Sequence, residues 1–428
     1  MRILEQGIDS ESDILAVLTA GSATNELEIE AVVREICQQV QRDGDQALLE
    51  LGQRFDSGEL SSIEVDASEI EAAFHSTPPH ITTALQRAAS NIHRFHEAEK
   101  QSSWMTLNGG STLGQIVRPM ESVGIYVPGG KAAYPSTVLM TAIPAAVAGV
   151  ERVAVATPVA ADGSVPRVVL AACHLCGVKQ VYKMGGAQAL AAFAYGTATV
   201  QRVDKVVGPG NQYVNVAKRL LFGRIGVDSL AGPSEVLIIA DASVPADWIA
   251  ADLMAQAEHG AESKSIVITW SRVLADKILS SIGALCRLEP RSEWISQSLA
   301  ARGALIVVED EVEALRLTNL CAPEHLQLLV GNPQEWIGRV RHAGAIFAGS
   351  YSPVPLGDYA AGPSHTLPTG TSARFSSALG VAEFQKRTSL IWYDKNEYAE
   401  DAKAAVTLAE AEGLHAHATS LRLRMAED

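Results

Sequence analysis

Short runs of β-branched residues alternate with alanine-rich stretches of helical length in the middle of the chain, and this alternation constrains the fold most. Four such runs predict strands, at residues 123–127, 152–156, 180–184 and 205–207. The stretches between them predict helices, at residues 135–148, 166–176 and 188–195. Strands that alternate with helices form parallel βαβ units, so we expect an α/β sandwich here.

A second alternating set begins after residue 230. It predicts strands at residues 235–239, 265–270 and 304–308, and a helix at residues 248–259. The chain therefore divides into two α/β lobes with a boundary near residue 230. We expect a mainly helical segment at residues 1–105, a first lobe at 106–230, a second lobe at 231–380 and a helical segment at 381–428.

The charge balance limits the partners of the chain. Its 428 residues include 34 basic and 49 acidic side chains, a net charge of −15, with no compensating run of lysine or arginine. Such a surface repels phosphate backbones and anionic lipids, so neither nucleic acid nor membrane is an expected partner. No apolar run reaches the roughly 18 residues that a membrane span needs. Five cysteines, a sparse and odd set, favour a reducing compartment, and we expect a soluble cytoplasmic protein.

Glycine-rich turns follow three of the predicted strands of the first lobe, at residues 128–130, 185–188 and 208–211. Ligands of parallel sheets bind beyond the carboxyl ends of the strands, where glycine lets the backbone approach a ligand closely. None of the turns matches the G-x-G-x-x-G fingerprint with its following acidic residue. The pattern indicates either a ligand-binding edge or turns that glycine only keeps tight.

Gln256 and His259 lie three residues apart in a predicted helix and so share one face. An amide oxygen and a neutral imidazole can both bind a divalent metal such as zinc, although a lone histidine on a helix is more often structural. Further ligands must come from elsewhere in the chain. The sequence offers Asp358 in a Gly/Pro-rich loop, and His415 and His417 near the C-terminus.

Glu324 and His325 follow Pro323 in a predicted loop, so the proline fixes the backbone just before an acid and an imidazole. Adjacent side chains on an extended segment point apart, which suits a base and a water-activating group. Cys321 is an alternative candidate as a thiol nucleophile beside them. The C-x-x-C motif at residues 173–176 lies late in a predicted helix without a second pair, so it indicates neither a structural zinc nor a redox site.

The motifs occur in an order that resembles the histidinol dehydrogenases, which perform the last steps of histidine biosynthesis. Residues 226–235, together with 256–259, are similar to the signature of that family. The other matching motifs lie at residues 124–130, 185–188, 208–211, 322–326, 357–360, 367–369 and 412–417. The resemblance covers nearly the whole chain and implies two incomplete Rossmann-like lobes with added helical segments.

The resemblance also implies a zinc site shared between two subunits. Gln256, His259 and Asp358 match family zinc ligands from one chain. His417 matches a fourth ligand, which in this family comes from the other subunit of a homodimer. The neighbouring His415 is interpreted as incidental.

Further residues match family positions with other roles. Glu324 and His325 match the acid/base pair, and Tyr126, Gln188 and Asn211 match the contacts with NAD. Glu412 would suit the cationic amine of the substrate. The residues implied to bind substrate are Ser234, Gln256, His259, His325, Asp358, Glu412 and His417.

The resemblance therefore implies oxidation of L-histidinol to L-histidine through bound L-histidinal, with two hydride transfers to NAD and one zinc ion per subunit. Manganese or cobalt could use the same ligands. Ser364 stands where the family often has Asn, which bears on the fit of the substrate. The alternative is a related zinc and NAD enzyme for another polar alcohol. The intact acid/base pair disfavours a non-catalytic homologue, and the glycine-rich turns disfavour a zinc hydrolase.

Overall fold

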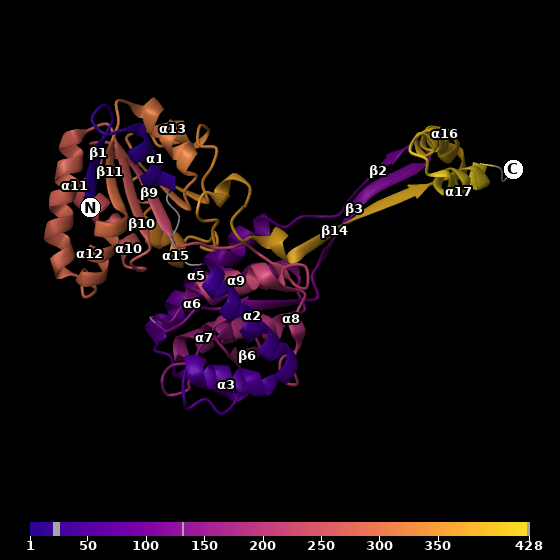
Figure 1. The fold of residues 1–428 in the computed structure, drawn as a ribbon, viewed down its shortest axis with the longest axis horizontal. Coiled ribbons are helices and arrows are strands. Elements are labelled where there is room, and N and C mark those ends of the chain that lie inside the picture. Colours follow the sequence, from indigo (N-terminus) through magenta and orange to yellow (C-terminus); the bar gives the residue numbers. More distant parts are fainter. Residues whose placement is uncertain (20–25, 131, 426–428) are drawn as a thin grey trace.

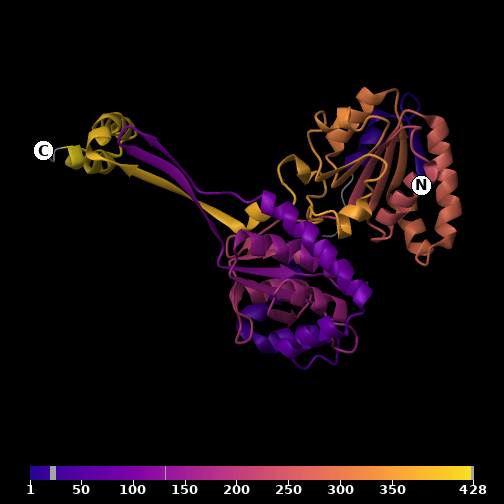
Figure 2. The same ribbon diagram turned by 180° about the vertical axis from the view of Figure 1, so that it is seen from behind.

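The computed structural model describes residues 1–19, 26–130 and 132–425, which form two α/β lobes and a slender arm (Figure 1). Each lobe is built on a parallel sheet, as the sequence predicts. The arm is an antiparallel ribbon that carries the C-terminal helices away from both lobes, as the view from behind also shows (Figure 2). The predicted α/β class with two parallel-sheet lobes is confirmed.

The sheet of the first lobe has the strand order β6-β5-β4-β7-β8, with all neighbours parallel. Its strands are β4 (Ser122–Tyr126), β5 (Arg152–Thr157), β6 (Gln180–Lys183), β7 (Lys205–Val207) and β8 (Gly226–Val227). One face is covered by α4 (Ala67–Ser76), α5 (Pro79–Ala98), α6 (Pro135–Ala148) and α7 (Arg167–Leu175). The other face is covered by α2 (Glu26–Asp43), α3 (Asp45–Phe55), α8 (Gly186–Tyr195) and α9 (Gln212–Leu221).

Helix α6 illustrates how local sequence sets these elements. Pro135 occupies the first turn, where its missing N–H leaves no hydrogen bond unmade. Gly149 adopts a left-handed conformation, with a φ of 92°, and ends the helix. The residues between are apolar on nearly every side because α6 is buried between the sheet, α5 and α7.

The sheet of the second lobe has the order β1-β11-β10-β9-β12-β13 and is also parallel throughout. Its strands are β1 (Arg2–Glu5), β9 (Glu235–Ala240), β10 (Lys264–Thr269), β11 (Gly303–Val307), β12 (His325–Leu329) and β13 (Ala345–Ala348). One face is covered by α10 (Ala246–Ala257), α11 (Arg272–Leu285) and α12 (Ser292–Arg302). The other face is covered by α1 (Glu11–Thr19), α13 (Glu311–Cys321) and α14 (Gln334–Ile337).

Strand β1 departs from the predicted N-terminal helical segment. It pairs with β11 from Arg2 opposite Ala304 to Glu5 opposite Val307, so the start of the chain is an edge strand of the second lobe. Four residues carry too little periodicity to reveal a strand, and their partner lies about 300 residues away. The part of the predicted segment at residues 20–25 lies outside the described residues.

The arm also corrects the sequence-based prediction. It consists of β2 (Trp104–Asn108), β3 (Ser111–Pro119) and β14 (Gln385–Tyr393), followed by α16 (Lys395–Ala411) and α17 (His415–Met425). The prediction of a helical segment at 381–428 is wrong over β14, which pairs with β3 along its whole length. Residues 106–119, expected in the first lobe, are arm strands instead.

Large apolar side chains lie exposed along the ribbon of the arm. They are Trp104, Met105, Leu107, Ile391 and Trp392, each more than half exposed in the single chain. Large apolar side chains exposed together on one ribbon often mark an interaction site. Among the described helices, none is both long and apolar enough to cross a membrane.

Candidate active site

Glu324 and His325 lie where α13 gives way to β12, at the amino end of that strand. Ala322 adopts a left-handed conformation, with a φ of 47°, and ends α13. Strand β12 then begins at His325, which is paired with Val236 of β9. The prediction of a loop is therefore wrong for His325, which is held in the sheet.

The carboxylate of Glu324 is buried and held by the start of β9. Its Oε2 accepts hydrogen bonds from the Ser234 hydroxyl at 2.7 Å and from the Glu235 N–H at 2.8 Å. Ser234 was predicted as a substrate contact, and its bond to Glu324 is a partnership that the sequence did not reveal. The acid is thus fixed in place, with Oε1 as the oxygen that can face a water.

The imidazole of His325 is buried, with one nitrogen engaged and the other without a partner. Nδ1 lies 3.0 Å from the carbonyl oxygen of Glu235 and 3.4 Å from Oε2 of Glu324. Nε2 makes no hydrogen bond within the described residues and lies 3.9 Å from Oδ1 of Asp358. Burial lowers the pKa of His325, but the carboxylates of Glu324 and Asp358 and the Glu235 carbonyl outweigh it and raise this pKa to about 9.

Asp358 lies in the last turn of the short helix α15 (Val354–Tyr359), rather than in the predicted loop. Its carbonyl oxygen lies 2.9 Å from Nδ1 of His365, whose Nε2 lies 3.2 Å from the Thr137 hydroxyl of α6. The segment that carries Asp358 is therefore tied to the first lobe. Burial lowers the pKa of His365 and outweighs the raising effect of Asp358, so the ring is neutral.

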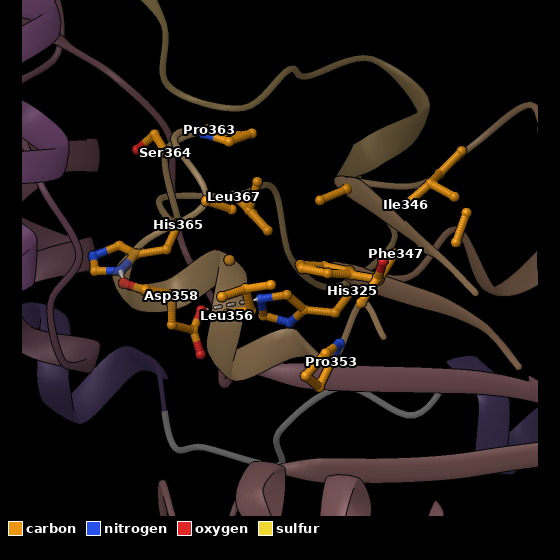
Figure 3. A pocket seen from close by; sticks show the side chains of 15 residues that line it. His325, Ile346, Phe347, Pro353, Leu356, Asp358, Pro363, Ser364, His365 and Leu367 are labelled. Carbon is orange, nitrogen blue, oxygen red and sulfur yellow. Dashed lines mark hydrogen bonds and ion pairs between the residues drawn. The ribbon is translucent and has the colours of Figure 1, made fainter. Parts of the chain in front are cut away.

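A cavity of about 230 Å³ lies beside these residues (Figure 3). His325, Asp358 and His365 contribute polar groups to it, and the aromatic ring of Phe347 lies against His325 with a centroid distance of 5.9 Å. Ser364 also lines it, but its hydroxyl accepts a hydrogen bond from the Thr366 N–H. Sequence reasoning missed His365, whose only signal was its place between two matching motifs.

Gln256 and His259 differ from their predicted arrangement. Gln256 lies in the last turn of α10 and is buried, with no hydrogen-bond partner for Nε2 in the described part of the chain. His259 lies beyond the end of α10 at Ala257, in a turn. Within residues 1–19, 26–130 and 132–425, no group of three His, Cys, Asp or Glu side chains is placed to hold a metal by itself.

Helix α10 and strand β12 place Gln256 and His325 at the same end of the second lobe. Asp252, one turn before Gln256, accepts a 2.6 Å hydrogen bond from the side chain of Gln327, two residues after His325. The helix of a βαβ unit runs back along its parallel strands. Gln256 lies one turn after Asp252 on α10, and His325 lies two residues before Gln327 on β12. Because the helix and the strand run in opposite directions, both residues lie at the same end of the layer. Gln256 on α10 thus lies at the same end of the layer as His325, and Asp358 reaches His325 from α15.

A larger groove of about 820 Å³ brings together residues predicted for three different roles. Asn211 from the first lobe and His259 from the second both line it, and Ser234 lies in the segment between them. The groove therefore runs from a glycine-rich turn of the first lobe to the residue that holds Glu324.

The three glycine-rich turns follow β4, β6 and β7, at the carboxyl ends of these strands, as predicted. Tyr126 is buried, its hydroxyl accepts a hydrogen bond from the Gly186 N–H, and burial raises its pKa to about 12. Gln188 is also buried. Asn211 caps α9, because its side-chain oxygen accepts from the N–H groups of the next turn at 3.0 and 3.1 Å.

Glu412 and His417 lie on the arm, exposed and far from the His325 cavity of the same chain (Figure 1). His415 is exposed beside them. A single chain therefore does not bring these predicted residues to the others.

The cysteines take no part in the arrangement. All five are free thiols, and burial raises the pKa of Cys321 to about 12. A thiol with such a pKa stays protonated near neutral pH, which argues against the alternative of a cysteine nucleophile. Cys173 is fully buried, and Cys176 lies at the end of α7.

Glycine-lined strand ends in one lobe and a buried acid–base pair in the other are the arrangement of an α/β dehydrogenase. The sequence model described as histidinol dehydrogenase matches residues 20–425. The chain belongs to the histidinol dehydrogenase family. Members of this family convert histidinol to histidine in histidine biosynthesis, so the chain is an oxidoreductase of that class.

Individual relatives agree over nearly the full length. The histidinol dehydrogenase of Oceanobacillus iheyensis is 48% identical, with 96% of each chain covered, and that of Neisseria gonorrhoeae is 46% identical, with 98% of each covered. The crystal structure of histidinol dehydrogenase from Elizabethkingia anophelis superimposes with a TM-score of 0.93 at 33% identity, covering 99% of this chain and 98% of that one.

Proposed function

We propose that this chain oxidises L-histidinol to L-histidine in two successive hydride transfers to NAD, with L-histidinal held in the site between them and one zinc ion per subunit. The observation that carries the proposal is the buried imidazole of His325. Its Nδ1 lies beside the Glu235 carbonyl and the Glu324 carboxylate, and its Nε2, which has no hydrogen-bond partner within the described residues, lies 3.9 Å from Asp358.

His325 takes the alcohol proton in the first step. The bond from Nδ1–H to the Glu235 carbonyl fixes the tautomer, so that Nε2 presents its lone pair to the substrate hydroxyl. NAD supplies the hydride acceptor in both steps.

Glu324 activates the water that adds to the aldehyde before the second step. Oxidation of an alcohol to an acid removes four electrons, so one water must enter between the two hydride transfers. Oε2 of Glu324 is fixed by Ser234 and Glu235, which leaves Oε1 to accept a proton from that water. The aldehyde stays bound between the two steps, because the adjacent residues His325 and Glu324 serve both steps in one site.

Gln256 and Asp358 suit a zinc site. Among the described residues, the buried amide of Gln256 has no partner for its nitrogen, and Asp358 presents its carboxylate at the same end of the layer. His259 of the same chain, together with His417 of the partner subunit, would complete a set of oxygen and nitrogen ligands that zinc prefers. These residues would hold a zinc ion, which would supply Lewis-acid chemistry to the bound substrate. The further contacts proposed for the substrate are Ser234 of the same chain and Glu412 of the partner subunit.

The edge formed by the three glycine-rich turns suits NAD. A Cβ on Gly208 would lie 2.2 Å from the Tyr126 carbonyl oxygen, so only glycine fits this close turn. Helix α8 begins within the turn at 185–188 and α9 begins directly after the turn at 208–211, so the positive ends of both helix dipoles lie at this edge, where they favour a pyrophosphate. Tyr126, Gln188 and Asn211 are the residues proposed to contact NAD.

The arm supports the proposal of a homodimer. It holds Glu412 and His417 away from its own lobes, and its ribbon exposes Trp104, Leu107 and Trp392. A second copy could cover this surface and receive the two residues in its own site. In this arrangement residues 106–230 serve NAD binding, residues 231–380 carry the metal and acid/base groups, and residues 381–428 act on the partner. The five free thiols support a cytoplasmic location.

The test is NAD reduction by the purified protein with L-histidinol. We expect about two NADH per histidinol, loss of activity with a chelator, and recovery with zinc. If a folded, zinc-loaded protein produced no NADH from histidinol, the proposed substrate would be wrong, and the alternative of another polar alcohol would replace it.

A further inference from the structure

A buried ion pair lies outside every residue assigned so far. Nζ of Lys218, on α9, lies 2.5 Å from Oδ1 of Asp228, and their side chains are only 1% and 3% exposed. Both charges are taken out of water, which costs free energy unless the remaining hydrogen-bonding groups are also satisfied. Their other partners therefore indicate what the pair holds.

Those partners are backbone groups, the N–H and carbonyl of Gly208 and the carbonyl of Ser229. Lys218 also donates to the carbonyl of Gly208 at 2.6 Å and to that of Ser229 at 3.3 Å. Oδ2 of Asp228 accepts from the Gly208 N–H at 2.8 Å. Both polar groups of Gly208 are thus bound by the same ion pair.

Gly208 opens the turn at residues 208–211, which is proposed to meet NAD. Its φ of 113° lies where side chains are rarely tolerated, and its backbone packs against the Tyr126 carbonyl at the end of β4. Asn211, which caps α9, ends the turn on the same helix that carries Lys218.

The same helix also holds the segment that leads to the acid. The side chain of Asn215, one turn before Lys218, accepts from the Ala231 N–H at 3.2 Å and donates to the Ala231 carbonyl. Three residues later in the chain, Ser234 donates to Glu324. Asn215, Ala231 and Ser234 all line the 820 Å³ groove.

We propose that Lys218, Asp228 and Asn215 form a positioning clamp, which sets the turn at residues 208–211 at a fixed place relative to Ser234 and Glu324. The clamp touches neither the proposed substrate nor the acid/base pair. It rests on the proposed function in one respect, that NAD binds at this turn. Its role is to keep the cofactor edge of the first lobe and the acid of the second lobe in register across the groove.

Asp228→Asn tests the clamp, because it keeps the shape of the side chain and removes its charge. A matched control is Glu383→Gln, which makes the same carboxylate-to-amide change in the Lys205–Glu383 pair of the first lobe, away from the groove. The affinity for NAD alone is measured by titration calorimetry on each full-length protein. A charged hydrogen bond lost at the clamp should raise the Kd for NAD about tenfold in Asp228→Asn, with Glu383→Gln within twofold of wild type.

Two further readouts separate positioning from general stability. Hydrogen exchange without ligand should quicken at residues 208–211 in Asp228→Asn and not in the control. In steady-state kinetics the KM for NAD should rise while kcat at saturating NAD stays within twofold. Equal NAD affinity and equal exchange in Asp228→Asn and wild type would overturn the clamp.

A variant that leaves no buried charge unpaired protects the test against misfolding. Asn215→Ala should raise the Kd for NAD several-fold and quicken exchange near residue 231, and wild-type values for both would overturn its place in the clamp. If wild-type protein binds no NAD, the cofactor proposal fails. Exchange at residues 208–211 then still decides whether the ion pair holds the turn.

Discussion

The backbone of Glu235 holds both members of the acid–base pair, because its carbonyl oxygen lies 3.0 Å from Nδ1 of His325 and its N–H donates to Glu324. A change in the position of this one residue would move both groups together. Its own side chain is anchored by Lys264 at 3.0 Å and by the Gly370 N–H at 3.1 Å. The relative geometry of acid and base is therefore a property of the start of β9.

Substitution of Glu324 by Gln should separate the two oxidation steps. The amide keeps the size of the side chain but cannot take a proton from water, so aldehyde oxidation should slow about 100-fold or more. Alcohol oxidation, assigned to His325, should fall far less. Single-turnover measurement of NADH from histidinol and from histidinal distinguishes the steps, and equal loss in both would refute this division of labour.

The first step should show a pH dependence that follows His325. Burial lowers the pKa of this residue, but Glu324 and Asp358 raise it to about 9, and only the neutral ring can accept a proton. The rate should therefore rise with pH toward about 9. In Glu324→Gln one raising carboxylate is gone, so the rise should move to lower pH. The profile of the first NADH, measured for both proteins in the same zinc-loaded state, checks this, and coincident profiles would contradict it.

Replacement of Gly208 by Ala should impair NAD binding more than a comparable change elsewhere. Its Cβ would meet the Tyr126 carbonyl at 2.2 Å, whereas a Cβ at Gly177, which also has a positive φ of 71°, meets nothing within 4 Å. Gly177→Ala should cost about 1 kcal/mol and leave NAD binding intact. Gly208→Ala should be less stable and bind NAD at least tenfold more weakly. Thermal unfolding and NAD titration measure the two effects, and equal results for both variants would count against the close turn.

A shared site predicts that two inactive variants restore each other. His325→Ala and His417→Ala should each be nearly inactive as homodimers. In a mixed dimer, one site carries both changes and the other carries none. Random reassociation should therefore recover about a quarter of the wild-type activity.

The control for this experiment mixes His325→Ala with Asp358→Ala. Both residues belong to the same chain's share of the site, so every site in the mixed dimer retains one change, and no activity should return. Recovery in the control, or its absence in the first mixture, would argue against an exchange of residues between subunits.

The sequence predicted the two lobes well because their strands and helices alternate over short distances. It did not reveal β14, whose residues alternate weakly and whose register is set by pairing with β3 more than 260 residues earlier. For the same reason the first lobe was predicted to begin at residue 106, inside what is an arm strand.

The motifs in the sequence identified the residues of the candidate site, but they did not predict its geometry. Glu324 and His325 were recognised, but their place at the amino end of β12 depends on which strands become neighbours. Asp358 was expected in a loop because Gly and Pro surround it, yet tertiary contacts fold it into α15. His365 and its bond to Thr137 join segments more than 220 residues apart, which no local pattern reports.

The pairing of β1 with β11 makes the first lobe an insertion within the second. During synthesis the edge strand emerges first, but its partners arrive only after the whole first lobe has been made. The sheet of the second lobe therefore forms only late in translation, when β11 has been made and β1 can pair with it. A fragment that starts after residue 230 would leave β11 as a bare edge, open to pairing with another molecule. Dissection of this protein into separate lobes would thus require β1 to be moved as well.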